Sequence, residues 1–177
     1  MNDITESEKK LASNAALVTL VTFLLGIIGF VALDVQLWYV FAIGQIALAI
    51  VIWYSPKVLQ RNNVPSIYNF FVTVTAAFIV VDTITWASVA PDGSPDDTTL
   101  GQLLFATACF YAYRYGENII PNIYRNALVL CVVFFVWDTI YFIGGLSISA
   151  YENLAPLGWL LVTLSTGLGF YQAYKNA

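Results

Sequence analysis

The chain has 177 residues, of which 59% are hydrophobic and only 10% charged, and its mean hydropathy is +0.75. Soluble domains are about 45–50% apolar and about 25% charged, so this composition indicates a protein embedded in a lipid bilayer. The absence of histidine excludes histidine-ligated haem or zinc centres and Ser-His-Asp or Cys-His catalysis, and seven Lys and Arg residues are too few for a nucleic-acid-binding surface.

Six apolar segments are long enough to cross a bilayer as helices, for which about 20 residues are needed. In chain order they span residues 13–33, 36–55, 66–89, 99–117, 125–146 and 153–174. Residues 1–12 form a leader in which Thr5 and Glu8 have the spacing of a helix capping box, so we expect the first helix to begin ahead of the membrane. Because backbone polar groups must be satisfied within lipid, we predict an all-α integral membrane protein with six transmembrane helices.

The charges at the segment ends predict the orientation. All basic residues lie on one side of the predicted membrane: Lys9, Lys10, Lys57, Arg61, Arg114, Arg125 and Lys175. The loops on the opposite side contain five acidic residues, Asp34, Asp92, Asp96, Asp97 and Glu152. The positive-inside rule then places both termini in the cytoplasm (N-in/C-in) of a protein of the cell membrane, inner or plasma.

An internal repeat is the most informative pattern in the sequence. When Val64–Trp86 is aligned with Ile120–Phe142, eight of 23 positions are identical, among them a Pro-x-Ile-Tyr entry and an Asp-Thr-Ile sequence. Glycines recur 57 residues apart in the following helices, where they allow close helix packing, and the first two precede glutamines; the residues are Gly44, Gly101, Gly158, Gln45 and Gln102. We predict three tandem pseudo-symmetric helical hairpins in one membrane domain, over residues 13–63, 64–118 and 119–177.

Asp82 and Asp138 are the candidate functional residues because they are ionisable and lie well inside predicted helices. A charge at that depth is costly, so such residues face a bundle interior or a wet cavity and are functional candidates. No basic residue is available at the same depth, and the neighbours that can form hydrogen bonds include Thr83, Thr139 and Tyr141. The sequence therefore predicts a binding site for a proton, a cation or a small polar solute.

These features favour a small membrane channel or carrier that handles its substrate through the two aspartates. The alternative is a non-transporting membrane subunit or scaffold, packed in a homo-oligomer or a larger complex, whose aspartates pin helix contacts. An enzyme is less favoured, because no second catalytic element accompanies the aspartates. We predict no catalytic residue, metal ligand or cofactor, and the lipid bilayer as the principal partner.

Two families are similar in size and helix number. Gly101–Tyr111 resembles a Gly-Leu-Leu-Phe stretch of the urea and amide channels, which are also built from three helical hairpins. Ala12 and Ala16 are similar to the small residues in the first helix of substrate-binding subunits of energy-coupling-factor transporters. Neither resemblance supplies site residues, and similarity of fold alone does not imply function.

Overall fold

The computed structural model describes residues 4–33, 37–59, 64–89, 98–143 and 156–177. Within these ranges the regular elements are all helical: α1 (Glu6–Leu33), α2 (Trp38–Leu59), α3 (Ser66–Val89), α4 (Thr98–Tyr115), α5 (Asn122–Ile143) and a last helix that begins at residue 156 and continues through η2 (Thr163–Gly169) and α7 (Phe170–Asn176). The expected all-α fold with six helices is confirmed for this part of the chain. The acidic loop residues named above lie outside the described residues.

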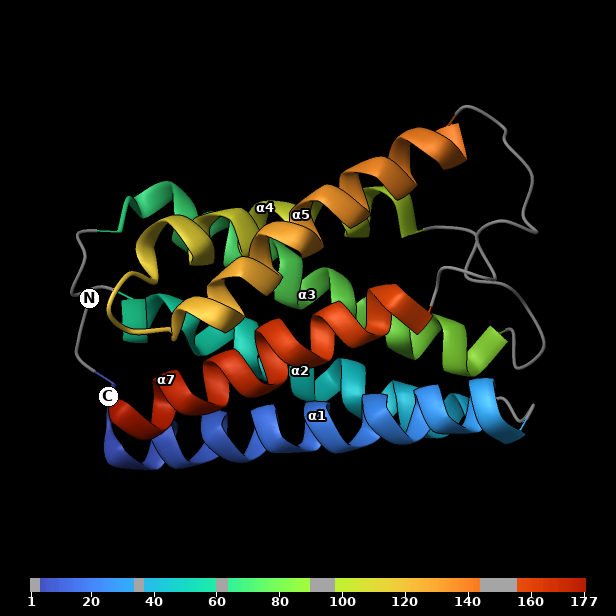
Figure 1. Ribbon diagram of the computed structural model, residues 1–177, viewed down its shortest axis with the longest axis horizontal. Coiled ribbons are helices and arrows are strands. Elements are labelled where there is room, and N and C mark those ends of the chain that lie inside the picture. Colours follow the sequence, from blue (N-terminus) through green and yellow to red (C-terminus); the bar gives the residue numbers. More distant parts are fainter. Residues whose placement is uncertain (1–3, 34–36, 60–63, 90–97, 144–155) are drawn as a thin grey trace.

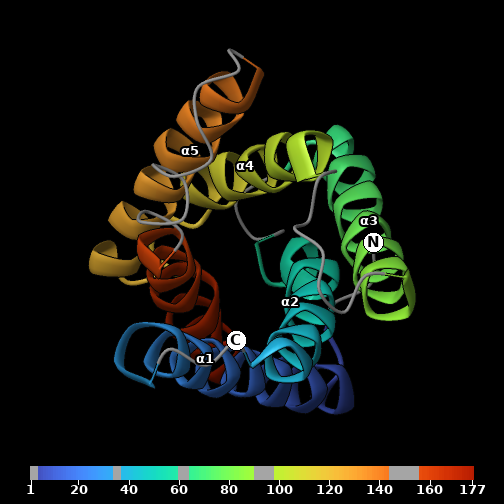
Figure 2. The same cartoon turned by 90° about the vertical axis from the view of Figure 1, so that its right-hand side faces the viewer.

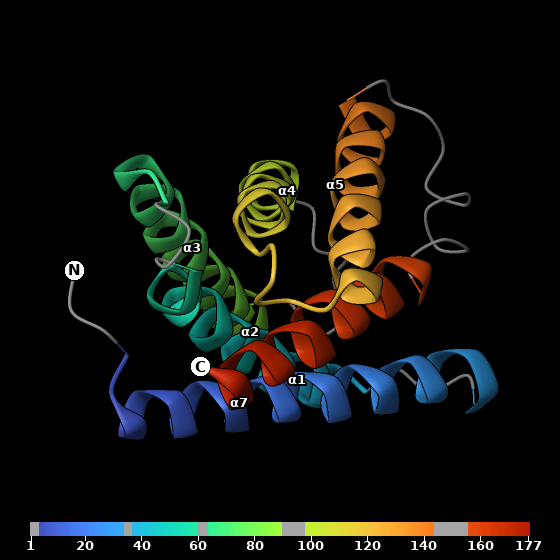
Figure 3. The same ribbon diagram turned by 60° about the vertical axis from the view of Figure 1, so that its left-hand side comes forward.

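Consecutive helices run antiparallel and form a closed ring in chain order, which the last helix completes by packing against α1 (Figures 1 and 2). α7 ends beside the start of α1, so both termini lie at the same end of the bundle (Figure 1). α4 lies between α3 and α5 (Figure 3). α3 and α5 incline away from α1, one on each side of α4. The arrangement therefore keeps the two helices that carry aspartates apart.

Within the part of the chain that the structure describes, four helices are long and apolar enough to cross a membrane. They are Glu6–Leu33, Tyr39–Leu59, Ser66–Thr85 and Asn122–Ile140. Large apolar side chains on these helices are exposed at the outside of the bundle, among them Ile28, Ile43 and Val133. A multi-pass membrane protein in contact with lipid accounts for such a surface. The described parts of α4 and of the last helix are not among these four.

The first helix begins at the predicted capping box. The backbone N–H of Thr5 donates to Glu8 Oε2 at 2.9 Å, and the N–H of Glu8 donates to Thr5 Oγ1 at 3.3 Å. Glu8 also forms an ion pair with Lys57, near the end of α2, with 2.5 Å between Oε1 and Nζ. The hydrogen bond from Lys57, followed by that from the Thr5 backbone, lowers the pKa of Glu8 to about 2. Glu8 therefore both caps α1 and fastens it to α2.

We expect Glu8→Gln to lower the thermal stability of the protein at neutral pH but not in strong acid. The pKa of Glu8 falls from 4.5 to about 2 on folding, so its contribution is complete above about pH 4.5 and is lost as the pH falls towards 2. Thermal unfolding in detergent micelles between pH 7 and 2 measures this difference. Glu6→Gln is the control, because that side chain is 92% exposed and lies 3.7 Å from Lys9. A Glu8→Gln effect of the same size at both ends of the range would contradict the interpretation.

A proline inside α2 is compensated by neighbouring hydroxyl groups. Pro56 has no N–H to donate to the carbonyl of Ile52, four residues earlier, and the hydroxyl of Ser55 donates to that carbonyl instead at 2.7 Å. Because this uses the only hydrogen of the Ser55 hydroxyl, the buried Tyr68 hydroxyl donates to Ser55 Oγ at 2.8 Å. The missing backbone hydrogen bond of α2 is thereby replaced, and the same hydroxyl connects α2 to the start of α3.

Candidate functional site

Asp138 lies at the interface between α5 and α4 and is only 3% exposed. Its Oδ2 accepts a hydrogen bond of 2.5 Å from Nε2 of Gln102, which lies near the start of α4. The hydroxyl of Thr139, also buried, donates to Oε1 of the same glutamine at 3.2 Å. One amide thus connects the aspartate to the threonine that follows it. We call these three residues the Asp138 cluster.

A corresponding set of residues lies between α2 and α3. The buried Thr83 hydroxyl lies 3.0 Å from Oε1 of Gln45 on α2 and 2.6 Å from the carbonyl oxygen of Ile79. Asp82 precedes Thr83 on α3 and is half-buried. Gln45 lies 57 residues before the glutamine of the Asp138 cluster, and Thr83 lies 56 before its threonine. Asp82, Thr83 and Gln45 are hereafter the Asp82 cluster.

The third equivalent position, between the last helix and α1, is aromatic. Trp159 occupies the place of the two glutamines, and its ring lies 5.7 Å from Phe30 and 4.3 Å from Phe41, measured between centroids. Gly26 occupies the place of the aspartates, 56 residues before Asp82. A Cβ atom at Gly26 would collide with the ring of Phe41. The first hairpin therefore has no room for a third carboxylate at this position.

The repeated glycines all lie against aromatic rings of the preceding helix. A Cβ atom at any of them would overlap that ring; the pairs are Gly44 with Phe23, Gly101 with Phe78, and Gly158 with Phe134. Phe78 and Phe134 are themselves aligned in the internal repeat. The glycines permit the two helices of each hairpin to approach closely.

The predicted site residues belong to two separate clusters. Asp82 lies on α3 and Asp138 on α5, with α4 between these helices, and different glutamines accompany them (Figure 2). The side chain of Tyr141 lies outside the described residues. Neither Gln45 nor Gln102 was among the predicted site residues. The available signal was the Gly-Gln pair that recurs after 57 residues.

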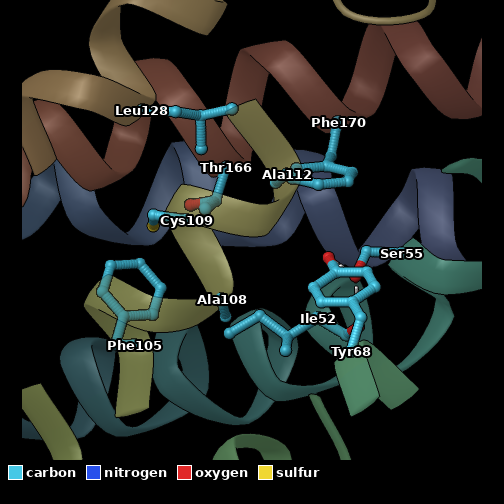
Figure 4. Close-up of a pocket in the computed structure, with 10 residues that line it drawn as sticks. All are labelled: Ile52, Ser55, Tyr68, Phe105, Ala108, Cys109, Ala112, Leu128, Thr166 and Phe170. Atoms are coloured by element: carbon cyan, nitrogen blue, oxygen red, sulfur yellow. Dashed lines mark hydrogen bonds between the residues drawn. The ribbon is translucent and has the colours of Figure 1, made fainter. Parts of the chain in front are cut away.

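A small central cavity lies away from both clusters. Its free space is about the size of one water molecule, and its lining comes from Ile52, Ser55, Tyr68, Phe105, Ala108, Cys109, Ala112, Leu128, Thr166 and Phe170. Figure 4 shows the Tyr68 hydroxyl bonded to Ser55 at one side, with Cys109 and Thr166 across the cavity. Neither aspartate lines it. In this conformation the cavity does not connect with the carboxylates.

The clusters do not have the composition of a metal centre. Among the described residues, no group of three or more Cys, Asp or Glu side chains converges. Cys109 and Cys131 are free thiols buried in the bundle. The chemistry of each cluster is therefore that of a carboxyl, an amide and a hydroxyl.

Comparisons with known protein families, with curated proteins and with solved structures found no match. The function must therefore be inferred from the geometry of the clusters.

Proposed function

We propose that the chain is a small multi-pass membrane channel or carrier in which Asp82 and Asp138 bind a proton, a cation or a small polar solute. The observation that carries the proposal is the burial of Asp138 against a neutral amide within a helix long enough to span the bilayer. Asp138 lies in the second half of α5, five residues before its end at Ile143, and there bears part of the cost of about 2.5–3.5 kcal/mol that insertion scales give for a charge at the helix centre. A carboxyl whose burial costs free energy recurs beside a glutamine and a threonine in two places. This recurrence argues against a chance arrangement and supports a binding role.

The proposed architecture is three pseudo-symmetric hairpins with six membrane spans and both termini in the cytoplasm of the cell membrane. Two features support it. The residues Pro65 and Pro121, 56 apart, directly precede α3 and α5, and the glycine contacts recur in all three hairpins. The basic residues that the structure describes lie towards the end of the bundle where the termini meet, as the positive-inside rule requires of a cytoplasmic face (Figure 1).

Flux measurements on proteoliposomes test the proposed function. We expect the purified protein to carry protons, monovalent cations or small neutral solutes across the bilayer, and the double variant Asp82→Asn/Asp138→Asn to fall to the level of protein-free liposomes. Asparagine keeps the size and hydrogen-bonding capacity of the side chain while removing its charge and its acidic proton. Glu117→Gln, an exposed acid next to the cytoplasmic end of α4, is the matched control. Equal flux through the wild type and the double variant would contradict the proposal.

A second candidate function is a non-transporting membrane subunit. It is favoured by one observation, that the central cavity has room for about one water molecule and touches neither aspartate. In that case the two clusters would serve only to hold neighbouring hairpins together. A wild type without measurable flux, together with a double variant that is merely less stable, would select this function.

A further inference from the structure

We infer that the Asp138 cluster is a one-proton site in which the Gln102 amide turns over when the carboxyl gains or loses its proton. The inference rests on the proposed function, and it selects the proton from the three kinds of ligand considered there. The repetition of the glutamine and threonine in the Asp82 cluster extends the same chemistry to a second site.

The orientation of the amide is the first argument. Nε2 of Gln102 points at Asp138 and donates to it at 2.5 Å, while Oε1 accepts from Thr139 at 3.2 Å. A sodium or potassium ion is held by oxygen atoms that converge on it. Here the amide oxygen of Gln102 accepts from Thr139, and the amide N–H group donates to Oδ2 of Asp138. A donor directed at the carboxylate oxygen is the arrangement expected for the ionised form of a proton-binding site.

The protonated form follows from the same three side chains. When Oδ2 of Asp138 takes a proton from a hydronium ion, which leaves as water, it becomes a donor and a much poorer acceptor for Nε2 of Gln102. Rotation of the amide by half a turn brings Oε1 to the new O–H group and brings the N–H group to Oγ1 of Thr139. Release of the proton reverses these movements. The O–H bond of the carboxyl forms as one O–H bond of the hydronium ion breaks, and no other bond changes.

The threonine needs an alternative acceptor for its own hydrogen, and the Asp82 cluster shows where it lies. Oγ1 of Thr83 lies 3.0 Å from Oε1 of Gln45 and 2.6 Å from the carbonyl oxygen of Ile79, four residues earlier. One hydroxyl hydrogen therefore has two acceptors within reach. In the Asp138 cluster the equivalent backbone acceptor is the carbonyl of Phe135, which Thr139 can use when the amide has turned.

No other described titratable side chain competes at this site. α4 and η2 pack against α5. On α4 the titratable group nearest to Gln102 is Cys109, seven residues or about 10 Å along the axis, and η2 carries none. On α5 itself Tyr141 lies three residues from Asp138, with a side chain outside the described residues, and the nearest described titratable side chain is that of Cys131, seven residues away. The remaining ones on these helices lie further towards the end where the termini meet: Tyr111, Tyr113, Arg114, Tyr115, Tyr124 and Arg125.

Infrared difference spectroscopy of the protein in lipid, between acid and alkaline pH, tests the inference. We expect a protonated-carboxyl C=O band in acid that is lost in Asp138→Asn. In Gln102→Leu this band should persist at a shifted frequency, and in Thr139→Val the amide band that changes with pH should diminish. Thr107→Val is the matched control, since its hydroxyl donates at 2.7 Å to the Leu103 carbonyl of its own helix. Circular dichroism identifies the variants that retain the helical fold and so enter the comparison.

Addition of NaCl or KCl at constant pH separates the proton from a metal cation. No change in the carboxyl bands supports a proton site, whereas a salt-dependent carboxylate band without any protonated form would overturn it. A carboxyl band whose frequency is the same in the wild type and in Gln102→Leu would also overturn the inference. These outcomes are independent of transport: a titrating cluster in a protein without flux upholds the inference while the proposed function fails. Sodium-driven flux through a protein in which Asp138 stays ionised would uphold the proposed function and overturn the inference.

Discussion

Replacement of Gln102 by leucine is expected to destabilise the folded protein by about 1–3 kcal/mol, because a buried carboxyl then loses the amide that satisfies it. Asp138 is 3% exposed and accepts from Nε2 of this glutamine, and Thr139 donates to its Oε1. The substitution removes both bonds: Thr139 can still donate to the backbone carbonyl of Phe135, but the carboxyl of Asp138 loses the amide that donates to it. Unfolding of the purified protein, followed by circular dichroism in detergent at increasing denaturant, measures the change.

The same variant becomes nearly harmless when the aspartate is removed with it. We expect Gln102→Leu combined with Asp138→Leu to be more stable than Gln102→Leu alone, because no carboxyl remains to be satisfied. Such a coupling, measured by a double-mutant cycle, shows that the two side chains interact. Strict additivity of the two substitutions would show that they do not. Thr107→Val, on the same helix, should change stability little.

A larger side chain at Gly26 is the second substitution with a large expected effect. A Cβ atom there meets the ring of Phe41, which packs against Phe23 and Trp159 at centroid distances of 5.8 Å and 4.3 Å and cannot easily withdraw. Overpacking a filled core costs about 1–3 kcal/mol, so we expect Gly26→Leu to lose at least this much stability.

Two further variants separate overpacking from a general effect of leucine in α1. Ala32→Leu introduces the same side chain on the same helix at an exposed position and should be nearly neutral. Phe41→Ala should restore part of the stability lost in Gly26→Leu, since it vacates the space that the new side chain needs. Equal losses in Gly26→Leu and Ala32→Leu would contradict the account of why the first hairpin lacks an aspartate.

The sequence predicted the helices well because their causes are local. The lengths of the apolar segments predict six helices, and the spacing of Thr5 and Glu8 predicts that α1 begins near Glu6. The repeated Pro-x-Ile-Tyr entry likewise predicts matching starts for α3 and α5. The residues that contact the aspartates depend on which faces of neighbouring hairpins pack together. The pattern of residues within a single helix does not predict that packing.

Other features escaped the sequence analysis for related reasons. Hydropathy does not distinguish an α-helix from the π-helical segment Thr163–Gly169, because it depends on composition alone and the two helices differ in the spacing of their backbone hydrogen bonds. Thr163 and Thr166 each donate to a backbone carbonyl four residues earlier, and this hydroxyl bonding is visible only in the folded helix. The aromatic closure by Trp159 could not be inferred either, because it requires that the last helix pack against α1.

The most direct test of the functional claim is the single variant Asp138→Asn, measured for proton flux and for thermal unfolding on the same preparation. The account predicts a variant that unfolds within a few degrees of the wild type, since asparagine still accepts the Gln102 hydrogen bond, and whose proton flux is greatly reduced. A variant that keeps the full proton flux of the wild type would contradict the account, because Asp138 would then contribute to the architecture alone.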